Sequence, residues 1–184
     1  MKRLFLGILL LAVVAIPAAA QSADNMQKRL DAEAAKLKAW AQDPLFVAAV
    51  VAQNNQHLTM AEITKRDEAW MAGKAATLIK EMTSGPCADH LRQLTGTSPI
   101  YSETFVMDNQ GAVVCENMQT SDYWQGDEAK WQRSFNGGKG AVFIDRPKLD
   151  ESSKEHLAQI SLPIMKDGKA IGAITIGIDI DKIK

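Results

Sequence analysis

This 184-residue sequence has few cysteines and no large excess of either charge. Its two cysteines are too few for a small domain built on disulfides or for a four-cysteine zinc site. Lys and Arg total 21 against 22 Asp and Glu, which gives a formal net charge of −1. Binding to nucleic-acid phosphates normally needs a basic surplus, so we expect no nucleic-acid partner.

Motifs for several kinds of chemistry are also absent from the sequence. There is no G-x-G-x-x-G, no P-loop and no C-x-x-C-H haem motif, and no H-x-x-x-H metal pair among His57, His90 and His156. A carboxylate-dependent hydrolase using Asp122 and Asp127 as acid and base is kept only as an alternative, because no nucleophile motif or histidine lies nearby. We therefore expect no enzyme, no cofactor and no metal.

The composition is that of one packed domain. Hydrophobic residues make up 46% and charged residues 23% of the chain, which excludes wholesale disorder. The length suits a single domain, which we place at 21–184 after a leader at 1–20.

The first twenty residues have the three parts of a secretory signal peptide. Lys2 and Arg3 supply a basic start, Leu4 to Pro17 is an apolar run of 14 residues, and Ala18-Ala19-Ala20 forms a small-residue cleavage site. A retained membrane anchor is the alternative, but it needs about 20 apolar residues to cross the hydrocarbon layer. We expect cleavage after Ala20 and a periplasmic, extracytoplasmic location.

Export affects the interpretation of Cys87 and Cys115. In an oxidising compartment two cysteines of one domain are usually paired, so we predict a structural disulfide between them. The bridge would close a loop of about 28 residues, worth roughly 3.6 kcal/mol in the chain-entropy model. A reactive thiol pair is the alternative, but the C-x-x-C spacing of oxidoreductases is absent.

Residues 21–98 have helical periodicity and helix-start signals. Apolar residues at spacings of three and four predict a helix over 24–42. Asp43 as N-cap and Pro44 at the first helical position predict a second helix. Thr59 and Glu62 form a capping box that predicts the start of a third. The stripe of the first helix is Met26, Leu30, Ala34, Leu37 and Ala41.

Residues 99–184 change to the period of two that is typical of strands. Two predicted hairpins and a third short strand between them give five strands, and Pro163 suggests a bulge or an edge position. A short helix is expected at 127–135. Helices followed by an antiparallel sheet predict an α+β fold. The predicted strands are 100–107, 112–116, 141–145, 157–165 and 170–179.

The last predicted strand has one bulky face and one slim face, because successive side chains point to opposite sides. The slim face carries Ala173, Thr175 and Gly177. Either a helix packs closely on it, or a ligand pocket lies above it, closed by the segment 120–131. The bulky face carries Ile174, Ile176, Ile178 and Ile180.

The segment 120–131 concentrates two tryptophans, a tyrosine and three acids in twelve residues. Apolar walls with a few polar groups are typical of small-molecule pockets. The alternative is that Trp124 and Trp131 are core anchors and that Asp127 caps the short helix.

At this segment the chain resembles the PDC-type sensor domains of the Cache superfamily, the extracytoplasmic PAS-like modules of bacterial receptors. The resemblance implies a long N-terminal helix on one face of a five-stranded antiparallel sheet and a small-molecule pocket on the other. It implies amino acids or small carboxylates as ligands. The residues that carry it are 40–53, 105–111, 120–131, 141–145, 160–164 and 167–174.

The chain departs from the receptor pattern because it ends at Lys184 without a second membrane span or a kinase region, and because its cysteine pair is not part of that pattern. We therefore expect an exported sensory module that binds a small metabolite and acts with a membrane histidine kinase or chemoreceptor. A periplasmic protein-interaction domain is the alternative.

Roles for individual side chains follow from the ligand class. Aromatic rings would form walls and cation–π faces, acids would hold a ligand amine, and Arg146 or Lys130 would meet a carboxylate. The predicted ligand-binding residues are Tyr101, Asp122, Tyr123, Trp124, Asp127, Trp131, Asp145 and Arg146.

Overall fold

The computed structural model describes residues 18–149 and 155–183. Residues 1–17 of the predicted signal peptide lie outside this part of the chain. The change from helix to strand falls between Thr95 and Tyr101. The helices are α1 (Ala18–Ala41), α2 (Pro44–Asn54), α3 (Met60–Met71), α4 (Ala76–Met82), α5 (Pro86–Thr95) and α6 (Ala129–Phe135), with a 3₁₀ turn at Asn136–Gly138. The strands are β1 (Tyr101–Met107), β2 (Val113–Glu116), β3 (Phe143–Ile144), β4 (Lys148–Leu149), β5 (His156–Lys166) and β6 (Lys169–Asp179).

The strands form one antiparallel sheet in the order β2-β1-β6-β5-β3, with β4 also paired to β5. The predicted α+β fold and the five predicted strands are confirmed. The expected strand number was wrong by one, because β4 has only two residues and carries no alternation to detect. Pro163 was expected to mark a bulge or an edge position; it pairs in register with Ala173, and a register shift follows it between Ile164 and Met165.

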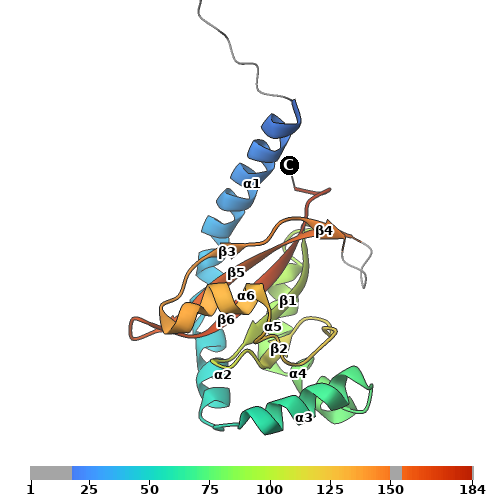
Figure 1. The fold of residues 1–184 in the computed structure, drawn as a ribbon, viewed down its shortest axis with the longest axis vertical. Helices are drawn as coiled ribbons and strands as arrows, with labels where there is room; N and C mark the ends of the chain where they lie inside the picture. The colour runs from blue at the N-terminus through green and yellow to red at the C-terminus, as the bar shows by residue number, and fades with distance from the viewer. Residues whose placement is uncertain (1–17, 150–154, 184) are drawn as a thin grey trace, which may run out of the picture.

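The main core lies between the helices and the face of the sheet that includes the bulky side of β6, and α1 packs mainly on β5. The side chains of Ile174, Ile176 and Ile178 are buried in the same cluster as Leu30 and Leu37 of α1. Helices α2 and α5 contribute to the same cluster, whereas α6 covers the other side of the sheet (Figure 1). At 1.5 Å per residue the 24 residues of α1 span about 36 Å. None of the helices in the described residues is long and apolar enough to span a membrane.

The first helix is fastened to one end of the sheet, where β1 begins and β6 ends. The Arg29 guanidinium donates a hydrogen bond to the carbonyl oxygen of Ile183, at 3.0 Å. The Tyr101 hydroxyl donates to the buried Glu33 carboxylate at 2.6 Å, and burial is the main reason why the pKa of Tyr101 is raised. Figure 1 shows the start of α1 and the end of the chain at the same end of the molecule.

Gly172 allows close packing where β6 meets β1 and α2. A Cβ atom at this position would lie 2.2 Å from the carbonyl oxygen of Met107 and 2.9 Å from a methyl carbon of Val50. Only glycine fits this approach of two backbones, so its position in a central strand is explained by packing.

The capping box predicted at α3 is present. The Thr59 hydroxyl accepts a hydrogen bond from the backbone N–H of Glu62, and the Glu62 carboxylate accepts one from the backbone N–H of Thr59. The bond from the Thr59 backbone is the largest cause of the lowered pKa of Glu62. Two N–H groups that the helix itself leaves unpaired are thereby satisfied.

Replacing Thr59 with alanine is expected to lower the free energy of unfolding by about 1 kcal/mol, because the N-cap hydrogen bond is lost. Urea denaturation monitored by circular dichroism measures the change. Thr64→Ala, at an exposed position inside the same helix, is the matched control and should be neutral or slightly stabilising. Equal effects of the two substitutions would contradict the role of the cap.

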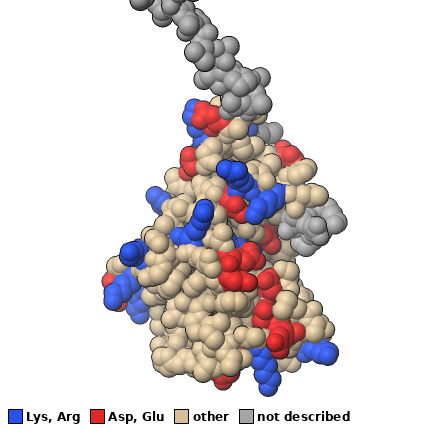
Figure 2. All heavy atoms as spheres, in the orientation of Figure 1, with Lys and Arg blue, Asp and Glu red and all other residues tan. Residues whose placement is uncertain are grey.

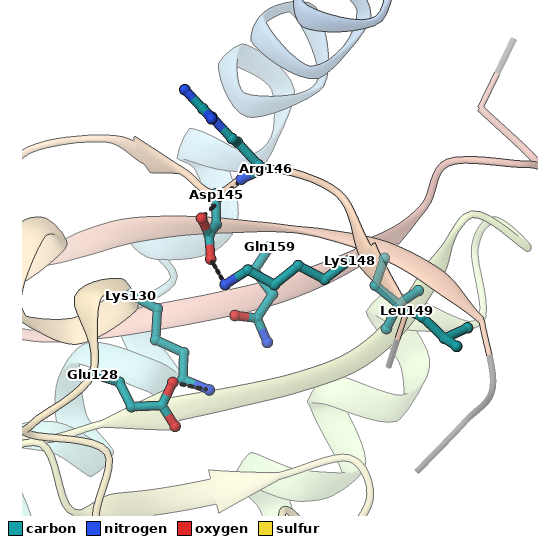
Figure 3. A pocket seen from close by; sticks show the side chains of 8 residues that line it. Glu128, Lys130, Asp145, Arg146, Lys148, Leu149 and Gln159 are labelled. Atoms are coloured by element: carbon teal, nitrogen blue, oxygen red, sulfur yellow. Dashed lines mark hydrogen bonds and ion pairs between the residues drawn. The ribbon is translucent and has the colours of Figure 1, made fainter. Parts of the chain in front are cut away.

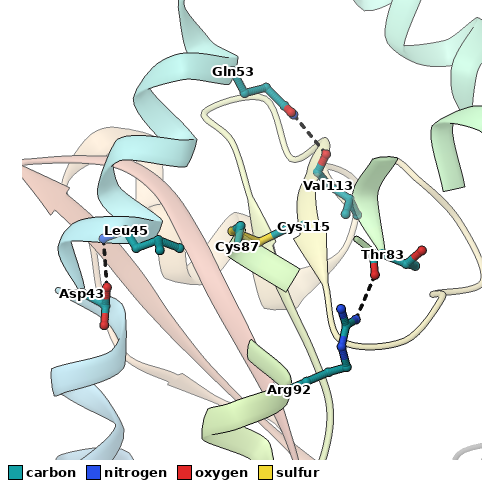
Figure 4. The surroundings of a disulfide bond; sticks show 8 residues. All are labelled: Asp43, Leu45, Gln53, Thr83, Cys87, Arg92, Val113 and Cys115. Atoms are coloured by element: carbon teal, nitrogen blue, oxygen red, sulfur yellow. Dashed lines mark hydrogen bonds between the residues drawn. A yellow bond between two sulfur atoms is a disulfide. The ribbon is translucent and has the colours of Figure 1, made fainter. Parts of the chain in front are cut away.

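The two cysteines are bonded, as predicted for an oxidising compartment. Cys87 at the start of α5 is joined to Cys115 in β2, with 6.0 Å between the Cα atoms (Figure 4). Nearby, the Gln53 amide of α2 donates to the carbonyl oxygen of Val113 at 3.1 Å. Covalent and polar links therefore hold the helical layer to the edge strand.

Charged side chains are mixed over the surface. On the face shown in Figure 2, acidic side chains gather toward the lower right, and Lys and Arg are scattered singly or in small groups. This face of the described residues has no continuous basic surface of the kind that binds nucleic acid.

Candidate functional site

The slim face of β6 is filled under the helix α6. Phe105 and Met107 of β1 are buried together with Ala173, and Trp131 of α6 packs against them. Beside them the hydroxyl groups of Ser161 and Thr175 lie 2.9 Å apart and are hydrogen-bonded. Close packing by a helix therefore accounts for this part of the slim face.

A hollow remains on the same face beyond the start of α6. It has a volume of about 190 Å³, and Figure 3 shows side chains from α6, from β4 and the segment before it, and from β5 around it. Gln159 of β5 lies at its base and pairs with Gly177 of β6, above which Glu103 and Leu157 pack closely. We call it the Gln159 pocket. It is lined by Glu128, Lys130, Asp145, Arg146, Lys148, Leu149, Leu157 and Gln159.

Ion pairs hold two of the cations at the Gln159 pocket. The Lys130 ammonium lies 3.1 Å from the Glu128 carboxylate and 5.2 Å from the centre of the Phe105 ring, so an aromatic face also stabilises its charge. The Lys148 ammonium donates to the Asp145 carboxylate at 2.7 Å. Both pairs are visible in Figure 3, on either side of Gln159.

Asp145 is held in its charged form. Partial burial alone would raise the pKa of this carboxyl group. Hydrogen bonds from the Lys148 side chain and the Arg146 backbone, with the charges of Lys148 and Arg133, outweigh burial and lower the pKa. The pocket therefore presents two carboxylates, each paired with a lysine, and the charge of Asp145 is maintained at neutral pH.

Gln159 and Arg146 differ in how they face the pocket. The Gln159 amide donates to the Glu103 carboxylate at 2.7 Å, which orients its carbonyl oxygen. Arg146 belongs to the lining, but Figure 3 shows its guanidinium directed away from Gln159 and Lys130. A rotation of this exposed side chain would be needed to bring it to a bound molecule.

Of the predicted ligand-binding residues, the structure brings Asp145 and Arg146 to the Gln159 pocket, together with Lys130, which was considered as a partner for a carboxylate. The others do not line it. They are Tyr101, Asp122, Tyr123, Trp124, Asp127 and Trp131.

Tyr123 and Trp124 attach their segment to α3 instead. The Tyr123 ring is fully buried, with its centre 5.8 Å from that of Trp70. The backbone N–H groups of Tyr123 and Trp124 each donate to the Asp67 carboxylate at 2.9 Å. The indole N–H of Trp124 donates to the carbonyl oxygen of Gln110 at 2.8 Å. These contacts describe core anchors.

Three other predicted residues also have structural partners. The Trp131 indole donates to the carbonyl oxygen of Asp108 at 3.0 Å, and the Asp122 carboxylate accepts from Gln125 at 2.8 Å. Tyr101 lies on the opposite side of the sheet, against Trp40 of α1. Asp127 is exposed and provides no side-chain cap for α6, whose N-cap position is Glu128.

The pocket residues that the sequence analysis missed are Glu128, Lys148, Leu149, Leu157 and Gln159. The alternation of the predicted strand 157–165 places Leu157 and Gln159 on one side, but their position opposite the slim face depends on the register with β6. Lys148 and Leu149 lie in the two-residue strand that left no pattern.

Two carboxyl groups are buried on or beside β1 and β2. The Asp108 carboxylate accepts hydrogen bonds from the backbone of Gln110 and Ala112 and from Gln53, and burial raises its pKa. Glu116 is fully buried opposite Phe105. Burial raises the pKa of Glu116 to about 7, despite hydrogen bonds from Thr120 that act in the opposite direction.

Residues 18–149 and 155–183 contain no recognisable metal site. No group of three or more His, Cys, Asp or Glu side chains lies close enough there to hold an ion.

Comparison with known proteins gives structural neighbours only. No family model matches the chain, and no curated protein matches it. Similar solved structures include the extracellular domain of a putative histidine kinase, at 16% identity and a TM-score of 0.43 over 70% of this chain and 58% of that one. They also include the ligand-binding domain of an amino acid chemoreceptor of Pseudomonas aeruginosa in complex with GABA, at 14% identity and a TM-score of 0.48 over 89% and 59%.

A third neighbour is the sensory domain of a Campylobacter jejuni chemoreceptor with isoleucine bound, at 13% identity and a TM-score of 0.40 over 84% of this chain and 62% of that one. The chain thus spans about three fifths of the length of these three structures. The three are an extracellular domain of a histidine kinase and a ligand-binding and a sensory domain of chemoreceptors. The observed architecture is α+β, with a long N-terminal helix and an open antiparallel sheet, as expected from the sequence.

Proposed function

We propose that this chain is an extracytoplasmic sensory module that binds a small metabolite in the Gln159 pocket. The observation that carries the proposal is the hollow itself, on the face of the sheet opposite α1, with cations, an anion and an amide brought together from α6, β5 and the segment 145–149. Convergent polar groups in a concavity are the usual mark of a binding site.

The lining supports a ligand that carries a carboxylate, an ammonium group or both. Lys130 and Lys148 are placed to meet a carboxylate, and Asp145 is charged and placed to meet an ammonium group. A volume of about 190 Å³ is below the usual range for drug-sized ligands, which favours a molecule of few atoms such as an amino acid or a short carboxylic acid. The PDC-type resemblance implies the same class.

The proposal also includes export of the chain and a membrane partner. The leader at 1–20 would direct the chain out of the cytoplasm, and a membrane histidine kinase or chemoreceptor would receive the ligand-bound form. A hydrolase based on Asp122 and Asp127 gains no support, because neither side chain lines the Gln159 pocket.

A thermal-shift and calorimetric screen of amino acids and short carboxylic acids tests the proposal. A true ligand stabilises the folded state by RT ln(1 + [L]/Kd), so its melting temperature rises with concentration. Lys148→Gln is expected to weaken binding of that ligand roughly tenfold, since a charged hydrogen bond is worth about 1.5–3 kcal/mol. Lys148 is 70% exposed, so the variant should fold normally.

Lys139→Gln is the matched control, because Lys139 is exposed and does not line the pocket. Its Kd should equal that of the wild type. A panel in which no compound shifts the melting temperature would count against a sensory role. A ligand whose Kd is the same for Lys148→Gln and wild type would show that binding occurs elsewhere.

A further inference from the structure

A second concavity lies between α3 and α4, at the end of the molecule away from the start of α1 (Figure 1). Its volume is about 530 Å³, within the range of small-molecule sites. We call it the α3–α4 groove. None of its lining residues is shared with the Gln159 pocket, so the inference below is independent of the proposed function.

The floor of the α3–α4 groove is apolar. Ala75 is buried, and Ala69 and Leu78 are partly buried against the cluster that contains Trp70 and Tyr123. This cluster is separate from the main core, so the floor is the outer surface of a packed layer. An aliphatic or aromatic group laid on it would remove apolar surface from water.

Three cations surround that floor. They are Lys65 and Arg66 of α3 and Lys74 of the turn that follows. Within the described part of the chain, Lys65 and Lys74 have no ion pair. Arg66 donates a long hydrogen bond to the Tyr123 hydroxyl, at 3.5 Å, and its charge helps to lower the pKa of Glu62, but it makes no direct ion pair with a described residue.

The acidic side chains nearby are engaged elsewhere. Glu62 is the only acid among the described residues that line the groove, and its carboxylate is bound by Thr59 in the capping box. The Asp67 carboxylate accepts from the backbone of Tyr123 and Trp124. The groove has three cations and one acid, which is already hydrogen-bonded, and this local excess of positive charge is unusual in a chain whose net charge is −1.

We propose that the α3–α4 groove binds an amphipathic carboxylate, a small molecule with an aliphatic or aromatic body and one acid group. The body would lie on Ala69, Ala75 and Leu78. The carboxylate would be held by Lys65 and Lys74 and by the planar guanidinium of Arg66, which suits two-point recognition of a carboxylate. The apolar floor favours a ligand with an apolar body over a polyanion, which would leave that floor uncovered.

Octanoate, titrated into the exported chain (21–184) by two-dimensional NMR and calorimetry, is the probe. We expect it to bind at least tenfold more tightly than 1-octanol, which lacks the charge, and than acetate, which lacks the apolar body. The chemical-shift changes should cluster in α3 and α4. Ala76→Glu, which places an acid at an exposed position in the lining, should weaken binding at least tenfold.

The double variant Lys65→Gln/Lys74→Gln should also weaken octanoate binding about tenfold. Both lysines are exposed, so the melting temperature of this variant should stay close to that of the wild type. Lys80→Gln, in α4 but outside the lining, is the matched control and should leave the Kd unchanged.

Equal affinity for octanoate and octanol would overturn the proposal, as would an octanoate Kd that is unchanged in both Ala76→Glu and the double lysine variant. Shift changes centred on Gln159 and lost in Lys148→Gln would assign octanoate to the Gln159 pocket and would equally overturn it. Failure of the metabolite screen at the Gln159 pocket has no bearing on these results.

Discussion

Removing both cysteines, as Cys87→Ala/Cys115→Ala, is expected to lower the free energy of unfolding by about 3.6 kcal/mol, the loop-closure value for a separation of 28 residues. The bridge restricts the unfolded chain over a loop that contains most of α5 and all of β1. Cys115 is buried, so alanine is preferred to serine, which would bury a hydroxyl group. Urea denaturation of the oxidised wild type and the double variant measures the difference.

The reduced wild type is the matched control for this variant. It should unfold at nearly the same urea concentration as Cys87→Ala/Cys115→Ala, since both lack the cross-link and differ only in two sulfur atoms. Other contacts between α5 and the residues after β2 are modest, such as the 3.4 Å hydrogen bond from Arg92 to the carbonyl oxygen of Asn117. A double variant as stable as the oxidised wild type would mean that the bond does not form in solution.

The second large effect concerns Glu116 and pH. Its pKa is raised from the ordinary 4.5 to about 7 in the folded protein, mainly by burial, so the folded state binds a proton more tightly than the unfolded state. Its contribution to stability is therefore fully present below pH 4.5 and is lost as the pH rises through 7. The shift of about 2.5 pH units corresponds to about 3 kcal/mol.

The surroundings of Glu116 explain why ionisation of its carboxyl group destabilises the folded state. One carboxylate oxygen accepts from the backbone and hydroxyl of Thr120, but the other is buried without a hydrogen-bond partner, and the charge of Glu103 opposes ionisation. Desolvation of a charge with one unpaired oxygen is expensive in a protein interior. The lowered pKa values of Asp145 and Asp179 affect stability only at lower pH, because their contribution is lost as the pH falls through values below 3.8.

Glu116→Gln should therefore abolish most of the loss of stability between pH 5 and pH 8, and should stabilise the protein at pH 8 by up to about 3 kcal/mol. The amide retains an acceptor for Thr120 and carries no charge. Urea denaturation at a series of pH values measures the effect. Glu68→Gln, at an exposed position of α3, is the control and should follow the wild-type curve. Parallel curves for Glu116→Gln and wild type would refute the assignment.

Local sequence patterns predicted the helices and the longer strands of this fold well, because each of these elements depends on residues close together in the sequence. The stripe from Met26 to Ala41, the N-cap Asp43 and the capping box at Thr59 are all observed where the sequence places them. The alternation of β6 also identified the face that packs on α1. The two-residue strand β4 was missed because its pairing with β5 is a property of the tertiary structure alone.

The candidate site was less predictable, because composition does not distinguish a pocket wall from a core anchor. Tyr123 and Trp124 are held by Trp70 and Asp67, about fifty residues earlier in the chain, and no local sequence pattern predicts that contact. The slim face of β6 is filled by Phe105 and Met107, which requires the register between β1 and β6. The small residues of β6 thus predicted the face of the sheet on which a hollow lies. They did not predict beside which end of the strand it lies.

The hydrogen bond between Arg29 and Ile183 has a practical consequence for experiments on immobilised protein. Because it holds the first half of α1 beside the residues that follow β6, the start of α1 and Ile183 lie toward one pole of the molecule (Figure 1). The α3–α4 groove lies at the opposite pole. Protein coupled to a sensor chip through a linker joined directly at the start of α1 or after Ile183 will therefore present the groove outward, toward the flowing solution.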